Sequence, residues 1–159
     1  MWTDFFVAAA GASAALAGLV FVSLSVNIAS ILRASHLPSR AGATIAMLIL
    51  ILVSSMAVLI HQSLPALGAE ILVFCLSGEW LQILSARRAF AAHVQLGRPT
   101  WEAHVSNVIG QLQVLPFVAG AILLLAGHDN GLYWVAAGAI SIFIFSVLNA
   151  WILLVEILR

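Results

Sequence analysis

The chain has 159 residues, of which 64% are hydrophobic and only 8% are charged, and its mean hydropathy is +1.15. A soluble domain carries about 25% charged residues, so this composition excludes a water-soluble surface and predicts a polytopic membrane protein. Six basic and six acidic residues leave no net charge, which argues against a nucleic-acid partner.

Five apolar stretches follow one another along the chain, each long enough to cross a bilayer once. They cover residues 5–32, 43–60, 65–86, 103–126 and 132–158. Because short loops join them, no second domain fits. We therefore predict one all-α domain, residues 1–159, that forms a polytopic membrane helix bundle of five transmembrane helices in contact with the lipid bilayer.

The cationic residues are all arginines, and the five-span arrangement places every one of them on the same side. They are Arg33, Arg40, Arg87, Arg88, Arg98 and Arg159. Cationic loops remain on the cytoplasmic side of the membrane. We therefore expect an outside N-terminus, a cytoplasmic C-terminus and location in the bacterial inner (plasma) membrane.

The first span carries small residues at helical spacing. Gly11, Ala15 and Gly18 form a smooth stripe, and such stripes let another membrane helix approach closely. The partner helix could belong to the same subunit or to a second one. Because so few helices can hardly enclose a pore in a monomer, we expect a homo-oligomer.

The second and third spans are separated by a tight outer turn. Pro38 and Gly42 are expected to break the chain before the second span, and Ser63 and Pro65 suit the first turn of the third helix. Nothing breaks that third helix before Gly97, so we expect it to project into the cytoplasm as an arginine-bearing extension.

The fourth and fifth spans contain a breaker and an aromatic border. Pro116, flanked by Gly110 and Gly120, should kink the fourth helix near mid-membrane, because proline removes one backbone hydrogen bond. Tyr133 and Trp134 mark the outer end of the fifth span.

Four of the five predicted spans carry an amide or carboxyl residue at a similar depth, counted from each inner end at about 1.5 Å per residue. On each helix these residues are three or four positions apart and therefore share one face. We predict a polar site centred on Glu79 and open toward the cytoplasm. Its residues are Glu79, Gln82, Asn107, Gln111, Asn27, Ser23 and Asn149, with Ser146 beside Asn149.

Three interpretations of this polar site remain open. Amide side chains could join the helices by hydrogen bonds, with a protonated Glu79 among them. Alternatively, Glu79 could be the titrating group of an ion or proton path, because an apolar span favours the uncharged form of a carboxyl group. The third interpretation is a pocket for a lipid or small molecule.

Sites for metals, cofactors and catalysis find little support in the sequence. Asp4, His61, Glu70, His128 and Asp129 gather at the outer side, but no two of them have a spacing that is diagnostic for a metal site. No pair of histidines within the spans suits haem, and no catalytic constellation is present. We therefore expect a protein that is not an enzyme and has no metal or cofactor.

Four segments resemble those of small bacterial five-helix inner-membrane proteins, some of which carry the name modulator of FtsH protease. The segments are residues 5–11 (FFVAAAG), 18–25 (GLVFVSLS), 131–134 (GLYW) and 148–156 (LNAWILLVE). The resemblance implies a membrane-anchored ATP-dependent protease as a partner. The arginine-bearing linker from Arg87 to Arg98 is the natural contact surface, although it suits anionic lipid head groups equally well.

Overall fold

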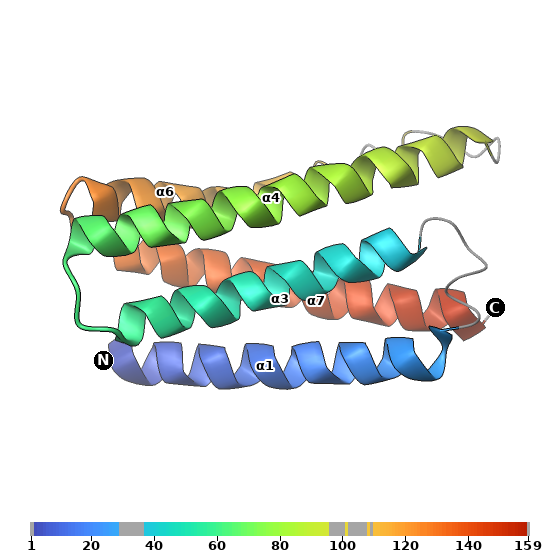
Figure 1. Ribbon diagram of the computed structural model, residues 1–159, viewed down its shortest axis with the longest axis horizontal. Helices are drawn as coiled ribbons and strands as arrows, with labels where there is room; N and C mark the ends of the chain where they lie inside the picture. The colour runs from blue at the N-terminus through green and yellow to red at the C-terminus, as the bar shows by residue number, and fades with distance from the viewer. Residues whose placement is uncertain (1, 29–36, 96–100, 102–107, 109, 159) are drawn as a thin grey trace.

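The computed structural model describes residues 2–28, 37–95, 101, 108 and 110–158, and the five helices named in it form an elongated bundle (Figure 1). Four helices are long and apolar enough to cross a membrane, and a shorter apolar helical stretch covers residues 110–125. The helices are α1 (Trp2–Val26), α3 (Leu37–Leu59), α4 (Leu64–Gln95), α6 (Leu115–Leu125) and α7 (Gly131–Leu158). The predicted all-helical class is confirmed, and the chain has the character of a membrane helix bundle.

Two helices extend beyond the predicted spans. Helix α3 begins at Leu37, so Pro38 and Gly42, which were expected to break the chain, lie inside it. Pro38 is accommodated because the first turn of a helix has no use for its missing N–H. Helix α4 runs without interruption to Gln95, as the lack of breakers before Gly97 predicted, and its exposed Arg87 and Arg88 lie in the last third of its length.

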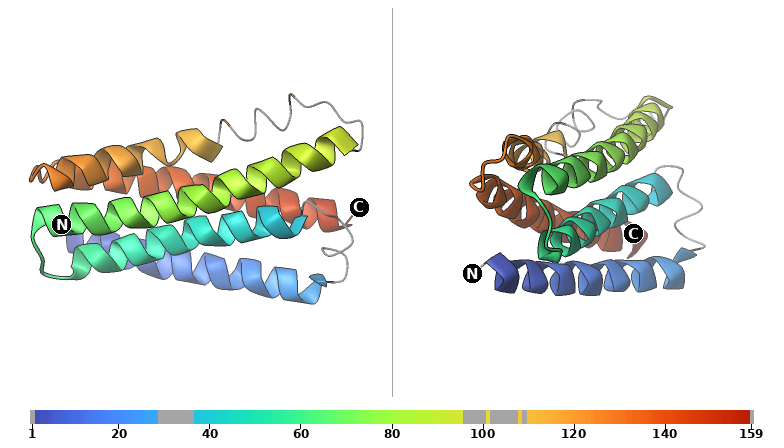
Figure 2. Two further views of the ribbon diagram at one scale, coloured as in Figure 1. Left: turned by 45° about the horizontal axis from the view of Figure 1, so that its top comes forward. Right: turned by 60° about the vertical axis from the view of Figure 1, so that its left-hand side comes forward.

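Successive helices run in opposite directions along the bundle (Figure 1). The N-terminus and the turns before α4 and α7 lie at one end, while the C-terminus and the end of α4 lie at the other. Helix α3 packs against α1, α4 and α7, and α6 lies between α4 and α7 (Figure 2). We call the end with the N-terminus the N-terminal end.

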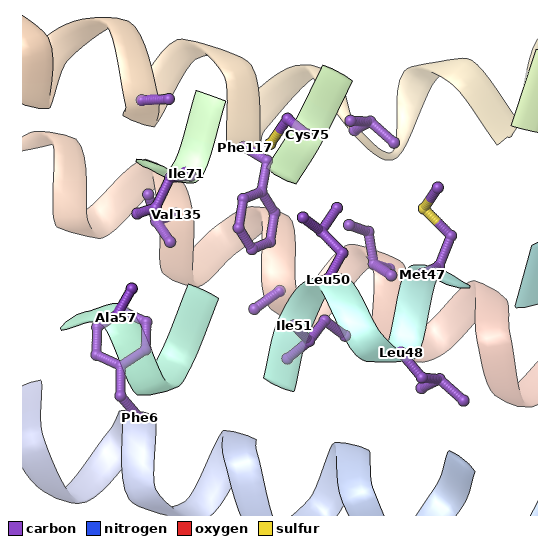
Figure 3. Packing of buried hydrophobic residues seen from close by; sticks show 14 of the residues in the cluster. Phe6, Met47, Leu48, Leu50, Ile51, Ala57, Ile71, Cys75, Phe117 and Val135 are labelled. Carbon is purple, nitrogen blue, oxygen red and sulfur yellow. The ribbon is translucent and has the colours of Figure 1, made fainter. Parts of the chain in front are cut away.

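Helix α3 supplies much of the apolar core. Met47, Leu48, Leu50 and Ile51 are almost completely buried and lie among side chains of α4, α6 and α7 (Figure 3). Helix α1 contributes a narrower seam, in which Phe6, Ser13 and Val20 recur at every seventh position and are buried. Most of α1 therefore remains on the outside of the bundle.

The small-residue stripe of α1 lies opposite that seam. Gly11, Ala15 and Gly18 are exposed, and a Cβ atom added at either glycine would have no atom within 4 Å apart from its own surroundings in the helix. The stripe therefore makes no close helix contact within the described part of the subunit. Contact with a second subunit stays a prediction.

Close helix contacts occur instead at glycines of α4, α6 and α7. A Cβ atom at Gly120 would come within 2.8 Å of the Gly131 carbonyl oxygen, and one at Gly138 would come within 2.8 Å of the Phe117 backbone nitrogen. Gly68 of α4 likewise meets the backbone of α6 near Leu125. Without side chains at these positions the three helices can approach backbone to backbone, as small residues allow in membrane proteins.

Candidate functional site

The fourth apolar stretch is broken in the middle. Residues 110–112 are helical, Gln113 and Val114 form a turn, and α6 begins at Leu115 with a proline in its first turn. The Val114 N–H donates to the Gln111 carbonyl oxygen at 3.2 Å, which is a tighter connection than the ordinary one to Gly110. Since Pro116 has no N–H, the helix cannot continue unchanged through this point.

A side chain of α4 bonds to the carbonyl oxygen of Gly110 beside this break. The Gln82 Nε2 donates to the Gly110 oxygen at 3.0 Å across 28 residues of chain. A Cβ atom at Gly110 would lie only 3.3 Å from the same nitrogen, so glycine gives the amide room to approach. In a regular helix the Val114 N–H would donate to the Gly110 oxygen, but here it donates to the Gln111 oxygen. Gln82 takes its place as the donor to Gly110.

Glu79 lies one helical turn from Gln82 on α4, at the side of the helix seam. Its side chain is half-buried, and both carboxyl oxygens are covered by protein without a hydrogen-bond partner in the described part of the chain. The Gln111 side chain is close enough to interact with this carboxyl group, but no hydrogen bond of good geometry joins the two. Glu79 and Gln111 are thus brought together, with a polar contact left incomplete.

The other described neighbours of Glu79 carry no charge at neutral pH. Cys75 lies one turn away on the same helix and is buried. On the adjoining face of α4, Gly78 lies against the side chains of Met47 and Leu50 from α3. The carboxyl group therefore lies near the apolar contact between α3 and α4 on one side and near the Gln111 amide on the other.

Two further buried side-chain oxygens lack a hydrogen-bond partner among the described residues. Gln113 Oε1 is one, and Gln113 shares a helix face with Phe117, whose ring lies against α7. Ser54 Oγ is the other, on α3 and about one turn from Leu50. Polar atoms in an apolar interior are normally hydrogen-bonded, so the unpartnered oxygens of Glu79 and Gln113 are unusual features of the region around the break. Ser54 lies about 10 Å further along α3 from Met47, nearer the N-terminal end.

Asn27 and Ser23 lie far from this group. Trp2 packs edge-on against Tyr133 at 4.6 Å, so α1 and α7 begin at the same level. At about 1.5 Å per residue, Asn27 lies about 37 Å from that level along α1. Gln111 lies only about 17 Å from the same level, counted along the fourth apolar stretch. Asn27 donates to the Ser23 carbonyl oxygen and Ser23 to that of Leu19, so both side chains bond within their own helix.

The remaining predicted site residues fall into three cases. Ser146 of α7 is buried near the level of Gly110, although no hydrogen bond joins it to Gln82 or Glu79. Asn149 is half-buried about one turn further along α7 and takes part in an interaction of its own. Asn107 lies outside the described residues.

The polar residues of the N-terminal end form a separate group. Gln62 Nε2 donates to Glu70 Oε2 at 2.9 Å and to the Ala57 carbonyl oxygen at 3.1 Å, which ties the turn before α4 to both flanking helices. Among the described residues, no group of three or more His, Cys, Asp or Glu side chains is placed to hold a metal ion. Glu70 therefore has a structural partner at the bundle end.

Sequence reasoning missed three polar groups at the level of Glu79. Ser13 is buried in the α1 seam and donates to the Ala10 carbonyl oxygen. Gln113 and the Gly110 carbonyl oxygen became part of the site only because the helix breaks. The six-residue separation of Gly110 from Pro116 was the available signal, since a proline disturbs hydrogen bonds in the turn before it.

No family model, no curated protein and no solved structure matches this chain.

Proposed function

We propose that this chain is an integral protein of the bacterial inner membrane with five membrane crossings, an outside N-terminus and a cytoplasmic C-terminus. The stretch of residues 110–125 and the residues before it would form the fourth crossing. The alternating helix directions support this arrangement, because they bring the start of α3, with Arg40, and the last part of α4, with Arg87 and Arg88, to the same end of the bundle.

We further propose that the protein moves a proton or another ion through the membrane, with Glu79 as the binding group. One observation carries this proposal: both carboxyl oxygens of Glu79 are buried beside the helix break without a hydrogen-bond partner among the described residues. An ionisable residue inside a span is costly, and such residues commonly mark ion paths or proton relays.

A purely structural role for Glu79 finds less support. Amide and carboxyl groups that join helices should be bonded to each other, because an unmade hydrogen bond contributes no stability and desolvation remains costly. Gln82 has that role, since it bonds to the backbone of the neighbouring helix. Glu79 does not, within the described part of the chain.

The proposed working form is a homo-oligomer. The small-residue face of α1 is exposed, and a single subunit keeps only a narrow seam of this helix inside. In lipid, faces of glycine and alanine allow close helix association without large side chains. A second subunit covering this face would complete the packing of α1.

The proposal is tested by flux measurements in liposomes that contain the purified protein. We expect the wild-type protein to dissipate an imposed pH or cation gradient and Glu79→Gln to reduce the rate to that of protein-free liposomes. Glu70→Gln is the matched control, because this carboxyl lies on the same helix but at the exposed bundle end. Absence of wild-type flux under every gradient, or unchanged flux in Glu79→Gln, would overturn the proposal.

The alternative function is that of a non-catalytic membrane regulator or scaffold, such as a modulator of a membrane protease. The exposed Arg87 and Arg88 on the α4 extension favour it, because they offer a charged surface beyond the apolar part of the helix. Copurification with a membrane protease that is lost in the variant with Arg87→Ala and Arg88→Ala, together with absent flux, would support this alternative.

A further inference from the structure

We infer that the ligand of the Glu79 site is a proton and that no metal ion binds there. This inference rests on the proposed function, in which Glu79 is the binding group. It follows from the number of oxygens that surround the carboxyl group, from the charge of the site and from the hydrogen-bonding capacity of Gln111.

The number of available oxygens is too small for a metal ion. Hard cations such as Ca²⁺ and Mg²⁺ take six or more oxygen ligands. In the described part of the chain the site offers four side-chain oxygens: the two of Glu79, that of Gln111 and Oε1 of Gln82, whose Nε2 donates to Gly110. The Gly110 carbonyl oxygen already accepts a hydrogen bond from Gln82, and Gln113 shares a face with Phe117, toward α7. A proton, in contrast, needs only one carboxyl oxygen.

The charge of the site also favours a proton. Among the described residues, the neighbours of Glu79 are Cys75 on α4 and Gln111 on the broken helix, and the apolar Met47 and Leu50 of α3 lie against the adjacent Gly78. None of these side chains carries a charge at neutral pH, so a divalent ion would leave the site with a net positive charge. Binding of one proton removes all charge from an apolar region, where a charge is costly.

Gln111 can serve both forms of the carboxyl group. Its amide nitrogen can donate to the carboxylate, and its amide oxygen can accept from the protonated acid. A rotation of this one amide would therefore accommodate uptake and release of the proton without movement of the helices.

The test uses dicyclohexylcarbodiimide, a hydrophobic reagent that modifies protonated carboxyl groups in apolar surroundings. The acid proton passes to a carbodiimide nitrogen and the carboxyl oxygen bonds to the central carbon, so the whole reagent is added and no group leaves. The full-length protein is treated in liposomes between pH 5 and pH 9, and the adduct is located by mass spectrometry of its peptides.

We expect an adduct on Glu79 whose yield decreases as the pH rises and does not change with 100 mM Na⁺ or K⁺ or with 10 mM Ca²⁺. Glu79→Gln should remove this adduct, and Glu70→Gln should leave it. Protection of Glu79 by any of these metal ions would overturn the inference. Absence of the adduct at every pH, together with no infrared carboxylic-acid band that disappears in Glu79→Gln, would also overturn it.

The proposed function and this inference fail in different ways. Labelling that depends on pH, with no flux, would mean that the site binds a proton but that the protein conducts none. Metal-protected labelling with a matching metal flux would leave the proposed function standing and replace the proton as its ligand.

Discussion

At the scale of single residues, the polar groups of the bundle fall into two classes. Ser13, Ser23 and Asn27 donate to a carbonyl oxygen three or four residues earlier in their own helix. Such side chains are satisfied locally and need no partner from another helix. Glu79, Gln113 and Ser54 retain buried oxygens without partners. Of the second class, only Glu79 belongs to the proposed ligand site, and spacing along the sequence cannot separate the two classes.

We expect Gln82→Leu to destabilise the protein. The substitution removes the only described donor to the Gly110 carbonyl oxygen, and a buried acceptor without a partner costs about 1–3 kcal/mol. Ser54→Ala is the matched control, because it removes a hydroxyl that has no partner and should leave stability unchanged or increased. Thermal unfolding in detergent measures both variants, and equal stability of Gln82→Leu and wild type would contradict the assigned bond.

At the scale of helices, the break before α6 and the glycine contacts around it act together. The chain turns at Gln113 and Val114, and α6 then packs closely against α4 and α7 through Gly68, Gly120 and Gly138. The helix ends in a turn that needs a left-handed residue: Gly127 has φ of 80°, and the N–H groups of Gly127 and His128 bond back to Leu124 and Leu123. These features hold Gln111 opposite Glu79.

We expect Gly120→Ala to reduce the free energy of unfolding by about 1–3 kcal/mol, which is typical of overpacking. The added methyl group would lie 2.7 Å from Val135 Cγ2 and 2.8 Å from the Gly131 carbonyl oxygen, so α6 and α7 would have to separate.

Gly11→Ala is the control for Gly120→Ala, because open space surrounds that position within the subunit. It should leave the stability of the dissociated subunit unchanged or slightly increased, since alanine favours the helix more than glycine. Thermal unfolding of both variants checks the comparison, and a greater loss for Gly11→Ala would contradict the described helix packing.

At the scale of the whole molecule, the alternating helices give the bundle two chemically different ends. Arg87 and Arg88 lie toward the end that holds the C-terminus, while His61, Glu70 and His128 lie at the N-terminal end. This separation agrees with the distribution of arginines from which the topology was predicted. The net charge of zero does not reveal this difference between the ends, because it sums the charges of the whole molecule.

We expect a membrane-impermeant maleimide to label His128→Cys in intact cells and Arg87→Cys only after the cells are permeabilised. Both substitutions are made in a Cys75→Ala background, so that one thiol is present, and both positions are exposed. Labelling of both cysteines from the same side would contradict the proposed topology.

Part of the fold and of the site could be predicted from particular residues. The uninterrupted α4 followed from the lack of breakers before Gly97, and the disturbance before α6 followed from Pro116. Counting residues along antiparallel helices predicted a polar site in which Gln111 lies near Glu79, and this site stays a prediction. The same counting placed Asn27 in that layer, but it assumed that every span ends at the same depth. Instead, the contact between Trp2 and Tyr133 sets the position of α1 along the bundle.

The sequence by itself determined that the chain is helical and apolar enough for a membrane, because hydrophobic content and the positions of breakers are local properties. Only the tertiary structure decided which faces meet and which polar atoms remain without partners. The stripe of Gly11, Ala15 and Gly18 stays outside, while Gly68, Gly120 and Gly138 make the close contacts. In this chain apolar residues occur on every helix face, so their periodicity does not show which face is buried. Only the helix packing shows that Glu79 lacks a described partner while the serines bond within their own helices.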